Sequence, residues 1–197
     1  MTTSQPELDG ATFEIPENEV VFRSIEEELI YQGAVVSFRQ AVIEGPDGER
    51  FDRDVIRHPG AVSVVAIDGD DVFLVNQYRA CLDTNLWEIP AGKRDVEGEP
   101  PEVTAHRELI EEVGMKAGSM ELLINVHHSP GFCDEYGYIY LASDLTEVPR
   151  QLEGPEEEHM LVLRTPIGVA VDMAMDGRIT DAKSVAGILA AARHLGR

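Results

Sequence analysis

One segment of the chain, residues 92–115, constrains the fold more than any other, and it reads GKRDVEGEPPEVTAHRELIEEVGM. Pro100 and Pro101 suit the first turn of a helix, because the N–H that proline lacks has no helical partner there. Gly114 suits the position just past the end of a helix, where the backbone often becomes left-handed. The sequence therefore predicts a helix between the two prolines and this glycine.

The predicted helix has an acidic side and an apolar stripe. Glu108, Glu111 and Glu112 are spaced i, i+3 and i+4, so their side chains project to one side of the helix. Like charges at this spacing cost about 0.2–0.5 kcal/mol per pair, so the chain either tolerates that cost on a wet surface or uses the charge to hold a cation. Carboxylate oxygens at this density suit Mg²⁺ or Mn²⁺. The expected apolar stripe consists of Val103, Leu109, Ile110 and Val113.

The second half of the segment, residues 107–115, reads RELIEEVGM and resembles the signature of the Nudix hydrolases. Glu99 lies eight residues before Arg107, as the signature requires, and is expected either to tie the loop down or to approach a metal through water. Gly92 lies seven residues before Glu99, one residue farther than in the signature, so the intervening loop is longer by one residue. Nudix domains are α/β/α sandwiches with a mixed sheet, and the resemblance implies this α+β fold here.

The composition bounds the class of partner. With 16 Lys and Arg against 37 Asp and Glu, the 197-residue chain carries a net charge of −21. This charge argues against nucleic acid and against an anionic membrane as partners. An anionic substrate would have to be held by a metal and a few local arginines. The length suits one domain with a small extension.

The cysteines and the first residues indicate the compartment. Cys81 and Cys133 lie far apart and form no C-x-x-C pair, which fits a reducing cytoplasm and neither a zinc site nor a disulfide scaffold. The first ten residues are polar, so no signal peptide is expected. No run approaches the ~18 apolar residues that a membrane span needs. We therefore expect a cytoplasmic protein.

Strand and helix signals alternate along the chain. The turn signal Gly45-Pro46-Asp47-Gly48 predicts a hairpin between residues 34–42 and 49–57. Further strands are predicted at residues 61–67, 72–79, 120–126, 136–142 and 160–163. Helices are predicted at residues 167–175 and 181–195, the second with Asp181 as its N-cap. This interleaving predicts a mixed sheet with helices on both faces.

His58-Pro59-Gly60 is the best candidate for a boundary between two parts of the chain. Residues 1–58 are expected to form a loose arm and a small β region, and residues 59–197 the Nudix domain. A β region of this size is too small to bury its own core, so we expect it to mediate a homodimer. The resemblance implies the same role, together with completion of the substrate site.

The resemblance to the Nudix signature implies which chemistry these residues perform. Nudix enzymes hydrolyse a nucleoside diphosphate linked to another group, and metals assist by neutralising phosphate oxygens and activating a water. By resemblance, Glu108 and Glu112 are the main metal ligands. Glu111 supports them, and the backbone carbonyl of Ala91 contributes a further oxygen. Arg107 is expected to hold the carboxylates by hydrogen bonds without contacting the substrate.

A late acidic loop is the expected source of the general base. By resemblance to the ADP-ribose pyrophosphatase subgroup, Glu158 is favoured and Glu156 comes second, although each could equally be a solvated loop residue. Asp134 and Glu135 are the alternative candidates. Three histidines could titrate near neutral pH but are expected in ordinary loop or surface roles: His106, His127 and His128.

Further residues resemble the same subgroup and narrow the substrate. Pro130 lies fifteen residues beyond Met115, where the subgroup tends to carry a proline that stiffens the turn beside the substrate. Arg79, in a Gln-Tyr-Arg run, is expected to contact phosphate or ribose, and Glu88 is expected to make a polar contact near the ligand. Arg53 is a candidate contact to the terminal ribose or a phosphate, across the dimer. An aromatic side chain could stack on adenine or simply pack in a core or interface: Phe22, Tyr31 or Phe38.

Three functions remain open from the sequence. The first is Mg²⁺-dependent hydrolysis of ADP-ribose or a related ADP-sugar to AMP and a sugar phosphate. The second keeps the chemistry but uses another sugar nucleotide, such as GDP-mannose or UDP-glucose. The third is a Nudix-like sensor that binds a nucleotide without cleaving it, which the intact box glutamates disfavour and the displaced Gly92 favours. RNA decapping is opposed by the net charge of −21.

Overall fold

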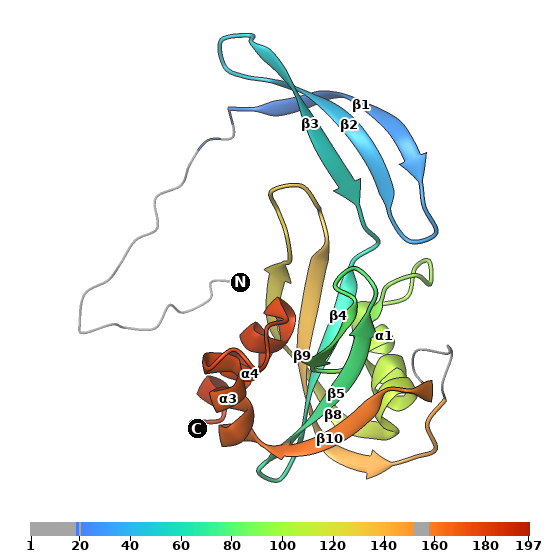
Figure 1. Ribbon diagram of the computed structural model, residues 1–197, viewed down its shortest axis with the longest axis vertical. Coiled ribbons are helices and arrows are strands. Elements are labelled where there is room, and N and C mark those ends of the chain that lie inside the picture. Colours follow the sequence, from blue (N-terminus) through green and yellow to red (C-terminus); the bar gives the residue numbers. More distant parts are fainter. Residues whose placement is uncertain (1–18, 20, 152–157) are drawn as a thin grey trace, which may run out of the picture.

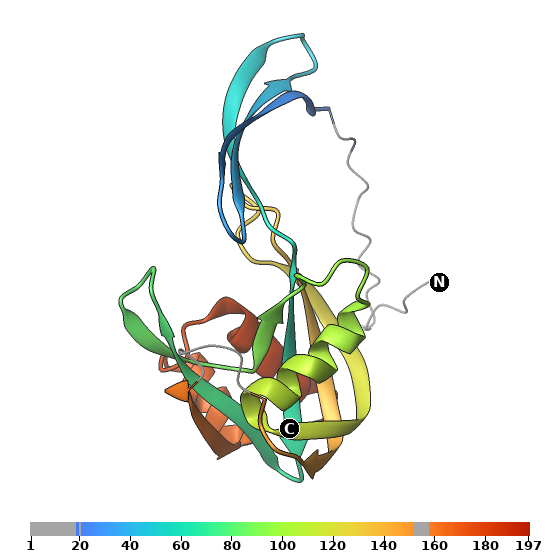
Figure 2. The ribbon, with the colours of Figure 1, turned by 90° about the vertical axis from the view of Figure 1, so that its right-hand side faces the viewer.

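The computed structural model describes residues 19, 21–151 and 158–197 of the chain. Within this part, the chain forms two sheets. A three-stranded sheet near the N-terminus stands away from a larger seven-stranded sheet that carries the helices (Figures 1 and 2).

The small sheet is an antiparallel meander of β1 (Arg23–Gln32), β2 (Ser37–Glu44) and β3 (Arg50–Arg57). Gly48 adopts a φ of 76° in the turn between β2 and β3, a backbone conformation that favours glycine. The predicted hairpin is therefore confirmed, with Arg53 on its returning strand.

The large sheet is mixed, as predicted. Its main strand order is β10-β5-β4-β9-β8, with β6 paired to β5 and β7 paired to β4. Only the β4–β9 pair is parallel among the described strands. The strands are β4 (Ala61–Asp68), β5 (Asp71–Arg79), β6 (Thr84–Glu88), β7 (Ala91–Lys93), β8 (Met115–His127), β9 (Tyr136–Glu147) and β10 (Leu161–Pro166).

Helices cover both faces of the large sheet (Figure 2). On one face lies α1 (Pro101–Glu108), which continues into a π-helical turn, η1 (Leu109–Val113). On the other face lie α3 (Ile167–Met175) and α4 (Ala182–His194). The molecule is thus the α/β/α sandwich that the sequence predicts. None of the helices in the described part of the chain is long and apolar enough to cross a membrane.

Strand β4 supplies the centre of two cores, because alternate residues of a strand point to opposite faces. Val62 and Val64 belong to the core under α1 and η1, whereas Val65 and Ile67 belong to the core under α3 and α4. All four side chains are buried. A strand covered on both faces has a nearly continuous apolar sequence, which is why residues 61–67 predict a buried strand.

The predicted helix begins at Pro101 and ends at Gly114, whose φ of 74° is left-handed. The predicted apolar stripe is partly wrong, because Val103 is 49% exposed. Ala105 is buried in its place, in the same core as Leu109 and Val113. The buried face thus follows the i, i+4 spacing of these three residues, and Val103 lies outside it.

The end of β3 is joined to the loop between β8 and β9. The Ile56 N–H donates to the Phe132 carbonyl at 2.7 Å, and the Asp134 N–H donates to the Ile56 carbonyl at 3.1 Å. The Asp134 carboxylate accepts from the His58 N–H at 2.8 Å and from Arg57 Nη1 at 3.1 Å. The small sheet is therefore hydrogen-bonded directly to the β8–β9 loop.

Candidate active site

The Glu108 carboxyl group packs directly against Gly92 of β7, in the space that a side chain would otherwise fill. A Cβ built on Gly92 would lie 1.8 Å from Glu108 Cδ and 2.0 and 2.2 Å from its two oxygens. Beside it, the Ala91 N–H donates to Glu112 Oε2 at 2.8 Å. The strand before the helix therefore positions two glutamates of the helix, one by the space a glycine leaves and one by a backbone hydrogen bond.

Arg107 lies among the glutamates of the helix and the preceding loop. Its Nη1 donates to Glu111 Oε2 at 2.9 Å and lies 2.9 Å from Glu108 Oε1. Its Nη2 is 3.5 Å from Glu99 Oε2. Thr104 Oγ1 donates to the same Glu99 oxygen at 2.7 Å, which ties the loop to the helix. Arg107 thus lies where it would hold the carboxylates together, and that role stays a prediction.

The glutamate cluster is buried and rich in negative charge. Glu108, Glu111 and Glu112 are 8%, 5% and 3% exposed. Burial raises the pKa of Glu108 to about 7, against the opposing effect of the Arg107 guanidinium. Buried carboxylates in this number need cationic partners. Arg107 lies against Glu108 and Glu111, and Arg79 is close enough to Glu112 to interact with it electrostatically.

The donor set of this cluster fits a hard divalent cation, because carboxylate oxygens are the ligands such ions prefer. Within the described residues, however, no three acidic, histidine or cysteine side chains already surround one point. The Arg107 guanidinium contacts oxygens of both Glu108 and Glu111. A bound cation would therefore compete with Arg107 for the Glu108 oxygens.

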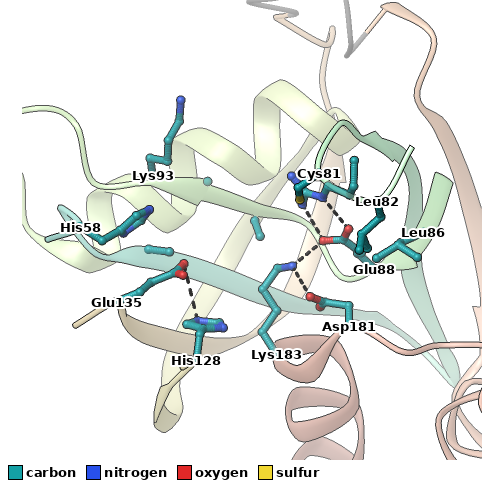
Figure 3. A pocket seen from close by; sticks show the side chains of 14 residues that line it. His58, Cys81, Leu82, Leu86, Glu88, Lys93, His128, Glu135, Asp181 and Lys183 are labelled. Carbon is teal, nitrogen blue, oxygen red and sulfur yellow. Dashed lines mark hydrogen bonds and ion pairs between the residues drawn. The ribbon is translucent and has the colours of Figure 1, made fainter. Parts of the chain in front are cut away.

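A cavity of about 390 Å³ is lined in part by Ala91 and Gly92, which lie against Glu112 and Glu108. Figure 3 shows other side chains that line it. One end is ionic and is formed by Arg79, Glu88, Asp181 and Lys183. The other end carries His58, Lys93, His128 and Glu135. Arginine and lysine side chains thus lie at one end of the cavity and a lysine at the other.

At the ionic end, Glu88 is 1% exposed and lies between two cations. Arg79 Nε donates to Glu88 Oε1 at 2.6 Å, and Arg79 Nη2 donates to Glu88 Oε2 at 2.6 Å. Lys183 Nζ donates to the same Oε2 and lies 2.9 Å from Asp181 Oδ1. The hydrogen bonds with Glu88 raise the pKa of Arg79 further above its usual range.

The N-terminus of α4 is fixed by Asp181, which confirms the predicted N-cap. Asp181 Oδ2 accepts from the Ser184 N–H at 2.9 Å. Ser184 Oγ accepts in turn from the Ile89 N–H at 2.9 Å, so α4 is bonded to the segment just after β6. Burial alone would raise the pKa of Asp181, but Lys183 and Ser184 together bring it below its usual value.

At the other end of the cavity, His128 faces Glu135, with 4.0 Å between Nε2 and Oε1. His128 Nε2 is buried and has no hydrogen-bond partner in the described part of the chain. The ring lies against Gly137, where a Cβ would come within 2.5 Å of Nε2. His58 Nδ1 accepts from the Gly60 N–H at 3.0 Å. This end therefore offers an unsatisfied ring nitrogen beside a carboxylate.

Comparison with known proteins decides the family. Residues 57–172 match the model of the NUDIX domain, which is more than half of the chain. The protein belongs to the NUDIX family. The match runs from the last residue of β3 into α3, so it includes every strand of the large sheet and the cavity wall formed by β5, β6 and β7.

Several NUDIX relatives are similar over most of their length. The chain is 40% identical over 170 residues to an ADP-ribose pyrophosphatase of Mycobacterium tuberculosis strain H37Rv, covering 86% of this chain and 82% of the relative. It is 38% identical over 167 residues to the methanol dehydrogenase activator of Bacillus methanolicus, covering 84% and 90%. The crystal structure of an ADP compounds hydrolase superposes with a TM-score of 0.78 at 23% identity, covering 92% of this chain and 97% of that one. That likeness supports the fold.

The NUDIX cavity brings together only some of the predicted substrate contacts. Arg79 and Glu88 line it. Arg53 lies on the small sheet, with its guanidinium 4.3 Å from the centroid of the Phe51 ring, outside the cavity lining of its own chain. Pro130 is exposed in the β8–β9 loop and is also outside the lining. Their predicted roles stay predictions.

The candidates for the general base fall in different places. Glu158 is exposed, and Glu156 lies outside the described residues. Glu135 lines the NUDIX cavity. The carboxylate of Asp134, in contrast, is engaged by Arg57 and the His58 N–H, so it holds the loop in place.

The aromatic candidates for adenine stacking all lie on or beside the small sheet. Phe22 packs edge-on against Phe51, with 6.0 Å between ring centroids. Tyr31 is 68% exposed, and Phe38 is half-buried. Stacking on adenine stays a prediction for each of them.

Sequence reasoning missed several residues of the NUDIX cavity. Lys93 and Lys183 are two of the chain's three lysines, and both line it. Because lysine is rare in this acidic chain, each lysine was a candidate for binding an anionic ligand. His128 was expected in an ordinary role but lines the cavity, whereas its neighbour His127 packs against Tyr136 with 4.9 Å between rings.

Proposed function

We propose that this NUDIX protein hydrolyses the pyrophosphate bond of ADP-ribose or a related ADP-sugar, giving AMP and a sugar phosphate. The observation that carries the proposal is a cavity lined by Arg79, Lys93 and Lys183. Its lining also includes Gly92, against which the Glu108 carboxyl group packs. Cations along a cavity attract a diphosphate. The 40% identity to a relative named ADP-ribose pyrophosphatase supports this choice of substrate.

The reaction requires a divalent metal, for which we propose Mg²⁺, with Mn²⁺ as a substitute. Such an ion neutralises phosphate oxygens and lowers the pKa of a bound water. Glu108 and Glu112 would hold it, with the backbone carbonyl of Ala91 as a further ligand. Glu111 and Arg107 would orient these ligands through the contacts described above.

The chain must also bind the substrate and accept a proton from the attacking water. Arg79 is proposed to contact a phosphate or ribose, with Glu88 holding its guanidinium in place. Glu158 is our first choice for the base and Glu156 the second. Glu135 is the alternative, supported by its place in the cavity lining.

We further propose a homodimer formed through residues 1–58, with residues 59–197 as the hydrolase domain. Large apolar side chains are exposed on β1 and beside it, which is typical of an interaction surface: Phe22, Ile25, Leu29, Ile30 and Tyr31. The dimer would allow Arg53 of one copy to reach the cavity of the other. Free Cys81 and Cys133 support a cytoplasmic location, and the net charge of −21 disfavours nucleic acid and membrane partners.

The test is product analysis with ADP-ribose, GDP-mannose and UDP-glucose, each with Mg²⁺ and with a chelator. We expect AMP release from ADP-ribose well above cleavage of the other two substrates. The chelator should abolish this release, and excess Mg²⁺ should restore it. Preferred cleavage of GDP-mannose or UDP-glucose would show that the proposed substrate is wrong. Tight binding of ADP-ribose without any cleavage would indicate a nucleotide sensor and contradict the proposed hydrolysis.

A further inference from the structure

Four side chains at one end of the cavity form a buried cluster, which we name the ionic quartet (Figure 3): Arg79, Glu88, Asp181 and Lys183. Lys183 extends from the first turn of α4 and is only 9% exposed. Its ammonium lies between the two carboxylates, as Figure 3 shows. The quartet therefore contains two positive and two negative charges and is neutral.

Within the quartet, both cations share one carboxylate. Glu88 Oε2 accepts from Arg79 Nη2 at 2.6 Å and also from Lys183 Nζ. Arg79 Nε is bonded to the other oxygen of Glu88. The pair uses two of the three guanidinium nitrogens, and the Arg79 side chain is 34% exposed. Arg79 can therefore be held by Glu88 and still present Nη1 to a ligand.

Lys183 decides the charge of this wall of the cavity. Without its ammonium, Arg79 would face Glu88 and Asp181 alone, and the quartet would carry a net charge of −1. Asp181 is close enough to act electrostatically on Arg79. With a net charge of −21, the chain has no surplus of positive charge to offset this loss. An anionic ligand would then meet a negative wall, and its affinity would fall.

The backbone before Ala91 and Gly92 is held by contacts that do not include the Lys183 ammonium. Ser184 Oγ accepts from the Ile89 N–H at 2.9 Å, and we expect this bond to persist when the neighbouring lysine is neutralised. Gly187 of α4 also packs closely on Ile89, because a Cβ there would lie 2.9 Å from Ile89 Cδ1. These contacts hold the backbone that leads to Ala91 and Gly92. Removal of the charge should therefore affect binding and spare the catalytic step.

We infer that Lys183 is a positioning residue for substrate binding, which acts through Glu88 to keep Arg79 available to a phosphate of a nucleoside diphosphate. The inference rests on the proposed function, in which Arg79 contacts the substrate. It assigns a role in the cavity to the N-terminus of α4, which lies 95 residues from Glu88 in the sequence.

The test compares the full-length wild type with Lys183→Met, which removes the charge and keeps most of the aliphatic side chain. AMP release from ADP-ribose is followed at saturating Mg²⁺. We expect KM to rise about tenfold or more, equivalent to about 1.4 kcal/mol of binding, with kcat within about threefold of the wild type. Lys183→Arg should bring KM back to within about threefold of the wild type, because it restores the charge.

Two further variants define the route and the control. In an Arg79→Gln background, Lys183→Met should raise KM no further, because residues that act as a unit are not additive. A second large increase in KM would show that Lys183 acts independently of Arg79 and would overturn the inference. Lys116→Met changes an exposed lysine on β8 outside the cavity and should leave both constants unchanged.

The remaining outcomes also decide the question. The inference is overturned, while the proposed function stands, if KM is unchanged in Lys183→Met. The same holds if kcat falls as much as KM rises and Lys183→Arg restores neither constant. No AMP release by the wild type would overturn the proposed function and the inference with it. If Lys183→Met does not fold, Lys183→Gln makes the same comparison. If neither neutral variant folds and Lys183→Arg does, the charge serves folding and the inference is wrong.

Discussion

Substitution of Gly92 by alanine should disable the enzyme through a single misplaced carboxylate. The added Cβ would lie 1.8 Å from Glu108 Cδ, which is about half of the 3.5–4.0 Å of an ordinary carbon contact. Small shifts of a few tenths of an ångström cannot relieve such an overlap. The backbone at Gly92 does not adopt a positive φ, so alanine causes no strain of its own there. The whole effect therefore passes through Glu108.

The displaced Glu108 would lose its contact with Arg107 Nη1, which is 2.9 Å in the wild type. A hydrogen bond to a charged group contributes about 1.5–3 kcal/mol to the free energy of unfolding. For a chain of this size, each kcal/mol lost lowers the melting temperature by about 2–4 °C. The melting temperature should therefore fall by roughly 3–12 °C. Displacement of a reacting group by about 1 Å costs around 100-fold in rate, so we expect kcat to fall by at least about 100-fold.

The assay is AMP release from ADP-ribose at saturating Mg²⁺, with thermal unfolding measured in parallel. Gly168→Ala is the matched control, because Gly168 lies in α3 with open space around its Cβ position. It should keep full activity. The double variant Gly92→Ala with Glu108→Gln should be no slower than Glu108→Gln alone, since both act on one carboxylate. Near-wild-type kcat in Gly92→Ala would refute the reasoning.

Three other outcomes are expected. Glu112→Gln keeps an acceptor for the Ala91 N–H but loses the charge, so kcat should fall by about 100-fold or more with an unchanged circular dichroism spectrum; near-normal activity would remove Glu112 from the ligands. Light scattering at micromolar concentration should find a dimer, and a monomer would remove the proposed role of Arg53. The folded-state pKa of Asp181 lies below its usual 3.8, so its carboxylate stabilises the fold above that pH and loses this effect as the pH falls further. The difference in melting temperature between wild type and Asp181→Asn should thus shrink from pH 7 to pH 3, and growth of that difference would contradict the assignment.

Local signals in the sequence were sufficient for most of the fold. The apolar run of β4, the Gly45–Gly48 turn and the helix limits at Pro101 and Gly114 each depend on neighbouring residues. Such features are determined by backbone preferences and by burial on one or both faces of an element. The π-helical turn of η1 was not predicted, because no local signal distinguishes it from a regular helical turn.

The candidate site was predictable only where a known signature covers it. Glu108 and Glu112 were assigned by resemblance to that signature, and the structure adds that both are buried and lie against Gly92 and Ala91 of β7. Lys183 and Glu88 meet across 95 residues, and nothing in either local sequence indicates the pairing. His128 resembled any loop histidine until the fold placed its ring nitrogen, buried, beside Glu135. Long-range contacts of this kind depend on topology, which spacing does not encode.

The hydrogen bonds between Ile56 and the β8–β9 loop join the small sheet to a loop that forms part of the cavity wall. Asp134 is clamped by the end of β3, and the adjoining Glu135 borders the cavity. A substitution that changes the tilt of the small sheet should therefore also move the loop that carries Glu135. We expect such substitutions, although they lie outside the cavity lining, to alter the position of a carboxylate inside it.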